Sequence, residues 1–92
     1  KELVVNSKSS ISLQKHNHRS EHWSIFSGKP KITINNRKFI KKANETAFIP
    51  RGAVHRIENP FRIPVKIMEV QTGHILKETD IVRYKDIYGR VN

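Results

Sequence analysis

The strongest constraint on this chain is a series of short β-rich segments that are separated by turn residues. They recur at roughly regular spacing over most of the 92 residues, a pattern typical of a β-sandwich or a β-barrel. The sequence therefore predicts an all-β domain. The expected strands cover residues 3–6, 11–18, 22–27, 31–35, 37–41, 47–49, 54–59 and 65–72.

Turn residues predict where the strands reverse. Asn35-Asn36 suits a two-residue type I′ hairpin turn, because both central residues need positive φ and Asn tolerates it. This turn would pair Ile34 with Arg37. Gly28 and Gly52 mark two further reversals, since Gly adopts backbone angles that are closed to other residues. After Gly28 and Gly52 the next segments should therefore run back along their predecessors.

The end of the chain follows a different pattern. After Gly73 the alternation stops, and the apolar spacing over residues 80–88 fits one or two helical turns. We therefore expect a short C-terminal helical tail. Because the chain begins with Lys1 and not with Met, we also expect it to be the C-terminal fragment of a longer protein.

Length and residue types limit the class of protein. A core of this size is marginal by itself, so we expect a single domain that forms a homodimer. The chain has no cysteine, so any metal must be bound through nitrogen and oxygen. No stretch approaches the roughly 18 apolar residues of a membrane span, and the N-terminus lacks the apolar part of a signal peptide. We expect a cytoplasmic location and no membrane association.

The net charge of +10 suggests an anionic partner. The 18 Lys and Arg residues are scattered and form no run longer than a pair, and the aromatic residues do not alternate with them. We therefore expect no nucleic-acid partner, although a charge-driven nucleic-acid-binding barrel stays open as a third hypothesis. A small phosphorylated ligand would also suit the charge.

Polar residues concentrate in one predicted strand. Gln14, His16 and His18 alternate along it and should share one face, where a barrel core would otherwise be apolar. A single inward His is more often a hydrogen-bonded core residue than a ligand. Here residues 14–22 hold three His, one Gln and one Glu, and His55 follows later, which favours one divalent metal ion. Zinc is our first expectation, with manganese, cobalt, nickel and iron as alternatives.

The segment around His55 matches the second cupin motif. That motif has a Pro-x-Gly turn, two residues, a His, three residues and an Asn, which correspond to Pro50, Gly52, His55 and Asn59. Its leading Gly is replaced by Asn44. The resemblance implies a cupin, a small jelly-roll-like barrel also called a double-stranded β-helix.

The first cupin motif aligns on Gly28. Counting back from it places Glu21 and His16 at the Glu and at the second His of the motif. Gln14 stands where the first His is usual, and His18 is an alternative ligand in its place. An amide oxygen binds divalent cations less strongly than imidazole does.

Most of the chain resembles one particular cupin family more closely. The segments that carry this resemblance are residues 12–23, 49–60, 69–73, 80–83 and 86–90. They are similar to the C-terminal domain of bifunctional mannose-1-phosphate guanylyltransferase/mannose-6-phosphate isomerase, the type II phosphomannose isomerases, in which Gln is usual at the first motif position. The resemblance implies one cupin domain over residues 1–92 that interconverts mannose 6-phosphate and fructose 6-phosphate in the pathway to GDP-mannose and polysaccharides. The chain lacks a Gly-rich nucleotide-binding segment, so we do not expect it to make GDP-mannose alone.

The resemblance also implies a set of site residues. The expected metal ligands are Gln14, His16, Glu21 and His55. The residues expected to carry catalysis are Arg19, His18 and His22. Either histidine would be the general base, with Glu21 as the alternative if it is not a ligand. Arg19 and Arg56 would bind the phosphate of the substrate.

Not every arginine is expected to bind the substrate, and a non-catalytic function is an alternative. The remaining arginines that we considered are expected to be solvated surface residues: Arg51, Arg62 and Arg83. A cupin fold with a metal site does not by itself imply catalysis. The alternative hypothesis is therefore a non-catalytic module that binds a metal or a sugar phosphate beside a guanylyltransferase domain.

Overall fold

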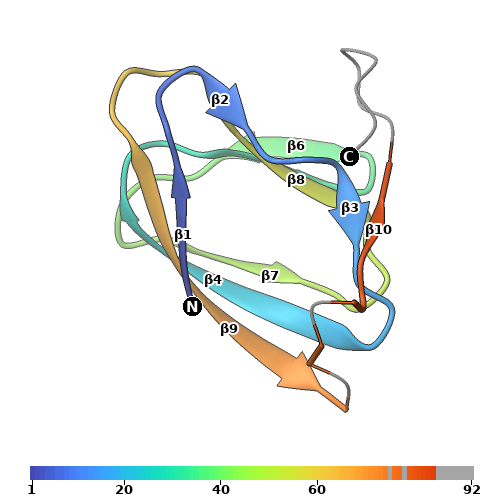
Figure 1. Ribbon diagram of the computed structural model, residues 1–92. Helices are drawn as coiled ribbons and strands as arrows, with labels where there is room; N and C mark the ends of the chain where they lie inside the picture. Colours follow the sequence, from blue (N-terminus) through green and yellow to red (C-terminus); the bar gives the residue numbers. More distant parts are fainter. Residues whose placement is uncertain (75, 78, 85–92) are drawn as a thin grey trace.

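The computed structural model describes residues 1–74, 76–77 and 79–84, and within them the chain forms ten strands (Figure 1). The strands are β1 (Glu2–Val5), β2 (Ser9–Ser10), β3 (Gln14–Lys15), β4 (Arg19–Ser27), β5 (Lys31–Ile34), β6 (Arg37–Ile40), β7 (Thr46–Ile49), β8 (His55–Asn59), β9 (Val65–Gly73) and β10 (Val82–Arg83). The all-β prediction is confirmed.

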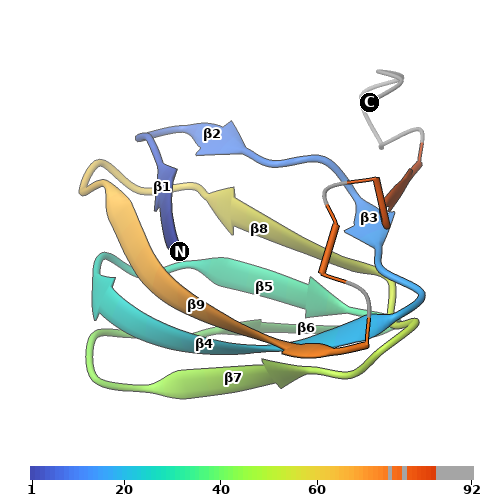
Figure 2. The same ribbon diagram turned by 60° about the horizontal axis from the view of Figure 1, so that its bottom comes forward.

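The strands build two antiparallel sheets that enclose the core. One sheet has the order β1-β9-β4-β7, and the other has the order β10-β3-β8-β5-β6 with β2 also paired to β8. Figure 2 shows β9, β4 and β7 side by side along one side of the barrel. None of the described segments is a helix of the length and apolarity that crossing a bilayer requires.

The alternation of side chains along β4 explains how the core is filled. Trp23 and Ile25 are each 1% exposed and point inward, whereas His22 before them and Phe26 after them are exposed. The apolar core consists of Val5, Trp23, Ile25, Ile32, Ala47, Ile49, Ala53, Ile57, Val65 and Ile67. Glu21 lies on the same inward face as these residues and is as deeply buried. A carboxylate in that position needs polar partners.

The hairpin between β5 and β6 has the predicted register. Ile34 pairs with Arg37 across a two-residue turn. Asn35 has a φ of 53°, but Asn36 is not among the described residues with positive φ, so the type I′ prediction is wrong in that detail. The Asn35 carboxamide oxygen accepts a hydrogen bond from the Val54 amide at 3.0 Å, which ties the turn to the approach to β8.

Two predicted elements differ from the structure. The expected strand over 11–18 is interrupted: only β3 is extended and paired, and the chain bends at residues 17–18. The amides of Asn17 and His18 donate to the carboxylate of Asp80 instead of to a neighbouring strand, which ends the ladder.

The expected helix over 80–88 is wrong for residues 80–84. These residues include β10, which pairs with β3, and the Tyr84 amide donates to the Leu13 carbonyl at 2.8 Å. Pairing with β3 supplies the backbone hydrogen bonds that a helix would otherwise provide. Residues 85–88 of the predicted helix lie outside the described residues.

Gly28 and Gly52 allow a matched test of how tightly the barrel closes. Both have a φ of 80°, but a Cβ on Gly28 would lie 2.7 Å from the Pro64 carbonyl oxygen, whereas one on Gly52 would meet nothing within 4 Å. We predict that Gly52→Ala lowers the free energy of unfolding by about 1–2 kcal/mol through backbone strain alone. Gly28→Ala should cost about 1–3 kcal/mol more, because the backbone must also shift. Urea denaturation of both variants measures the difference, and equal losses would contradict the close contact.

Candidate metal centre

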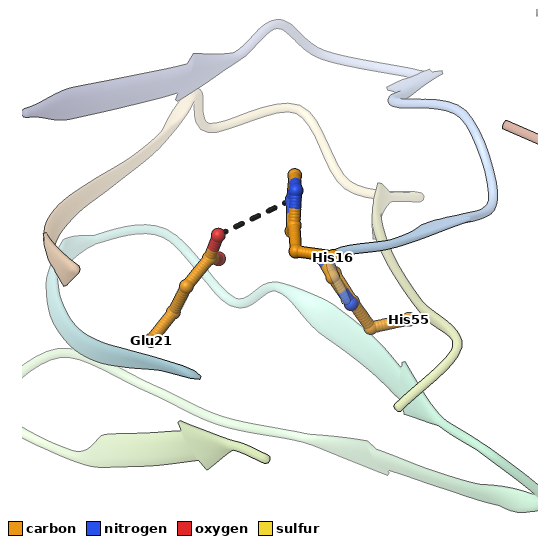
Figure 3. Close-up of side chains that lie close together, drawn as sticks. All are labelled: His16, Glu21 and His55. Carbon is orange, nitrogen blue, oxygen red and sulfur yellow. Dashed lines mark ion pairs between the residues drawn. The ribbon is translucent and has the colours of Figure 1, made fainter. Parts of the chain in front are cut away.

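Three ligand-type side chains from separate elements meet inside the barrel. His16 follows β3, Glu21 is on β4, and His55 begins β8, and they are 5%, 2% and 2% exposed. One ligand atom from each lies within 4.8 Å of the others. Figure 3 shows Glu21 and His16 facing each other, with the Glu21 Oε2 atom 3.3 Å from the His16 Nε2 atom.

Hydrogen bonds orient both imidazoles in the same way. The His16 Nδ1–H donates to the Asp80 carbonyl oxygen at 2.6 Å, and the His55 Nδ1–H donates to the Ala53 carbonyl oxygen at 3.0 Å. We assign these tautomers because carbonyl oxygens can only accept. In the neutral ring this leaves the lone pair on Nε2, and a hydrogen bond of this kind is what usually orients a metal-binding histidine.

The charge state of His55 suits metal binding. Burial lowers its pKa to about 4, and nearby His16 and Arg19 add to this effect, although the hydrogen bond to Ala53 and the charge of Glu69 act against it. His55 is therefore neutral at pH 7. A neutral imidazole is the form that binds a metal ion.

Glu21 is held by donors on both oxygens. The Trp23 indole N–H donates to Oε1 at 3.0 Å, and the Arg19 Nε–H donates to Oε2 at 3.1 Å. Arg19 also donates from Nη2 to His16 Nε2 at 3.1 Å. A bound metal and Arg19 would compete for that lone pair.

The donor set fits a divalent metal ion. Two ligands about 2.1 Å from a metal in tetrahedral or octahedral geometry lie about 3.0–3.4 Å apart. The spacing of 3.3 Å between His16 Nε2 and Glu21 Oε2 falls within this range. Two imidazoles and one carboxylate are also the nitrogen and oxygen ligands that zinc and related ions accept. The residues expected to hold the metal are thus brought together by the fold.

A cavity of about 510 Å³ adjoins the three side chains. Its lining residues are Lys1, Leu3, Ile11, Ser12, Gln14, His16, Arg19, Glu21, Trp23, His55, Glu69, Ile81 and Arg83. Gln14, the expected fourth ligand, is among them and pairs with His55 across β3 and β8. Its Nε2 donates to the Ser12 carbonyl at 3.4 Å. Gln14 is therefore next to the trio, and its role as a ligand stays a prediction.

The cavity does not include three residues that the sequence suggested for catalysis or substrate binding. His18 has a side chain that is 53% exposed and bonds to Asp80, so the expectation that it shares a face with His16 is wrong. The bend after β3 breaks the alternation on which that expectation rested. His22 lies on the outer face of β4, with its ring 4.7 Å from that of Phe48. Arg56 lies next to His55 on β8 and so points to the opposite face, where it is 3.7 Å from Glu58.

Glu69 is a cavity residue that the sequence reasoning missed. It is 5% exposed, faces inward on β9, and accepts a hydrogen bond from the Gln71 amide at 2.6 Å. Burial raises its pKa, the nearby Glu21 carboxylate raises it further, and the Gln71 hydrogen bond only partly offsets them. The available signal was the period-two spacing from Val65 and Ile67, which places Glu69 on the apolar inner face.

One known protein family matches most of the chain. The family described as "Mannose-6-phosphate isomerase C-terminal" matches residues 1–86. The chain belongs to this family. The isomerase-family domain is 46% identical over 88 residues to a mannose-1-phosphate guanylyltransferase of Klebsiella pneumoniae. It is 44% identical over 92 residues to the alginate biosynthesis protein AlgA of Pseudomonas putida.

These matches cover 96% and 100% of the isomerase-family domain but only 19% of each relative. Among solved structures, a Klebsiella pneumoniae protein with a double-stranded β-helix domain superposes with a TM-score of 0.80 at 19% identity. That match covers 92% of this chain and 72% of the other. The cupin fold expected from the two motifs is confirmed.

Asp80 positions His16, one of the candidate ligands of the isomerase-family domain, and the sequence reasoning missed this as well. Its carboxylate accepts hydrogen bonds from the amides of Asn17 and His18 and from His18 Nδ1, at 2.9–3.1 Å. Burial alone would raise the pKa of Asp80, but the hydrogen bonds from His18 and Asn17 outweigh it and hold the pKa below its ordinary value. Because its own carbonyl holds His16, Asp80 connects the bend at residues 17–18 to the metal centre.

We predict that Asp80→Ala weakens metal binding by about 10- to 100-fold, because the bend at residues 17–18 loses its carboxylate acceptor and no longer fixes the position of the residue 80 carbonyl that orients His16. Competition with a chromophoric chelator measures the affinity, and circular dichroism checks that the variant is folded. Glu2→Ala, a change at an exposed acid on β1, is the control and should bind metal like the unmodified chain. A folded Asp80→Ala variant with undiminished affinity would show that the bend does not position His16.

Proposed function

We propose that this chain is a metal-dependent mannose-6-phosphate isomerase domain that acts in the cytoplasm as a homodimer. It would interconvert mannose 6-phosphate and fructose 6-phosphate and so feed the synthesis of GDP-mannose and polysaccharides. The observation that carries the proposal is the buried trio of His16, Glu21 and His55 beside a cavity, in a member of the isomerase family. Any guanylyltransferase activity would belong to the larger part of such relatives that this chain does not match.

One divalent ion, zinc foremost, would be held by His16, Glu21 and His55, with Gln14 next to them as a fourth donor. When bound, the ion would act as a Lewis acid that polarises the sugar carbonyl. Arg19 would keep its hydrogen bond to Glu21 and so hold that carboxylate in place. The Trp23 N–H does the same on the other oxygen, so Glu21 is suited to be a ligand and not a mobile base.

The proton transfer requires a base inside the cavity. In this reaction a proton leaves C2 of mannose 6-phosphate and is returned at C1, through an enediol. Glu69 is the cavity carboxyl group to which no arginine among the described residues donates a hydrogen bond, and its raised pKa makes it a stronger base than an ordinary carboxylate. We assign it the role that the sequence suggested for His18 or His22, both of which face away from the cavity.

A non-catalytic module is the second candidate. The outward positions of His18 and His22 favour it, because they remove both histidines that were expected to move protons. Such a module would bind the metal or a sugar phosphate without turning the sugar over. Turnover distinguishes the two candidates.

We predict that the purified chain contains about one divalent metal ion and converts mannose 6-phosphate to fructose 6-phosphate in a coupled assay. Chelation should abolish turnover and a divalent ion should restore it, and His55→Ala should lose both metal and activity. His74→Ala, which removes an exposed histidine, is the matched control and should retain both. Bound metal without turnover would favour the non-catalytic module. A chain that binds no metal would contradict the isomerase proposal and would leave only a module that binds a sugar phosphate.

We predict that Glu69→Gln lowers kcat by about 100- to 10,000-fold while metal content is unchanged, because the amide cannot accept the C2 proton. Steady-state kinetics and metal analysis on the same preparation measure the two effects. Glu2→Gln is the control for loss of one acidic group. A kcat within about tenfold of the unmodified enzyme would mean that another group is the base.

A further inference from the structure

The arginines of this domain differ in their availability to an anionic ligand. Arg19 already donates to Glu21 and to His16, at 3.1 Å in each case. Arg56 is on the opposite face of β8 from His55 and is not among the described residues that line the cavity. Arg83, which the sequence suggested as a surface residue, does line the cavity. Its guanidinium has no hydrogen bond or ion pair with any described residue.

Strand pairing connects Arg83 to the metal centre. Gln14 pairs with His55 across β3 and β8, and it also pairs with Arg83 across β3 and β10. In-register neighbours project from the same face of a sheet, so His55, Gln14 and Arg83 form one row. Two strand spacings, about 10 Å in total, separate the first backbone position from the last. That interval leaves room for a sugar between the metal centre and Arg83.

The acidic side chains of the cavity and Arg83 lie at different depths. Glu21 and Glu69 lie near the metal centre and are buried, so the carboxylate charge is at depth. Arg83 is exposed and borders the cavity from β10. At depth the Arg19 guanidinium is already engaged by Glu21 and His16, whereas the Arg83 guanidinium is available to a phosphate group. A sugar phosphate would therefore enter with its carbonyl end inward and its phosphate outward.

We propose that Arg83 binds the phosphate group of the sugar-phosphate substrate at the mouth of the cavity. A guanidinium can hold two phosphate oxygens through parallel N–H donors, which fixes the orientation of the ligand as well as its affinity. The proposal rests on the proposed function in taking a sugar phosphate as the ligand. It replaces Arg19 and Arg56 as the phosphate-binding residues.

The test compares Arg83→Gln and Arg83→Lys with Arg62→Gln in the metal-loaded chain. Arg62 is exposed in the loop between β8 and β9 and is not among the described residues that line the cavity, so its substitution controls for the loss of one positive charge. Arg83→Gln is expected to raise KM for mannose 6-phosphate by about 10- to 100-fold with little change in kcat. Inhibition by inorganic phosphate should weaken in parallel. Arg83→Lys should restore part of the affinity, because it keeps the charge but not the two parallel donors.

Calorimetry with mannose 6-phosphate and with inorganic phosphate supplies a readout that does not depend on turnover. If the unmodified chain binds mannose 6-phosphate without converting it, and Arg83→Gln weakens that binding, the isomerase proposal fails and the role of Arg83 is supported. Undiminished affinity of Arg83→Gln for both ligands would overturn the role of Arg83. An equal loss in Arg62→Gln would overturn it too, since the effect would then come from net charge.

Discussion

Two hydrogen bonds from imidazole N–H groups to backbone carbonyls are the interactions on which the candidate metal centre depends. A buried polar group without a partner costs about 1–3 kcal/mol, and His16 and His55 avoid that cost by donating to Asp80 and Ala53. The same bonds leave Nε2 as the ring nitrogen that can bind a metal, in a cluster that also contains Glu21. Stability and ligand geometry thus have a common origin, because the bonds that make burial tolerable also select the tautomer that binds a metal.

Unusual backbone positions allow the chain to bring these groups together. Asn44 stands where the second cupin motif has Gly, and its φ of 72° lies in the left-handed region that Asn tolerates better than most residues. The departure from the motif therefore preserves the turn that leads into β7. At Gly73 a Cβ would collide with the His18 carbonyl oxygen and lie 2.8 Å from the Arg19 Cα atom. A glycine at that point lets β9 approach the beginning of β4, on which Glu21 is placed.

Features that depend on local patterns were predictable from the sequence, and features that depend on distant contacts were not. The register of the β5–β6 hairpin follows from Asn35 and its neighbours, and the ligand spacing follows from the two motifs. The position of His18 was not predictable by alternation, because the bend after β3 is stabilised by Asp80, more than 60 residues away. Arg56 lies away from the cavity for a simpler reason: it is adjacent to His55 in sequence and therefore on the opposite face of the strand.

The segment after Gly73 is best understood as part of the site. Asp80 supports His16 through its carbonyl oxygen, and β10 places Arg83 beside Gln14. Both contacts arise because β10 pairs with β3, which is the strand that leads directly to His16. The cupin motifs end at Asn59, so they specify the candidate ligands but not this segment. The motifs that contain the candidate metal ligands are thus shorter than the structure that orients them, and a barrel ending at β9 would keep His16 without its carbonyl partner.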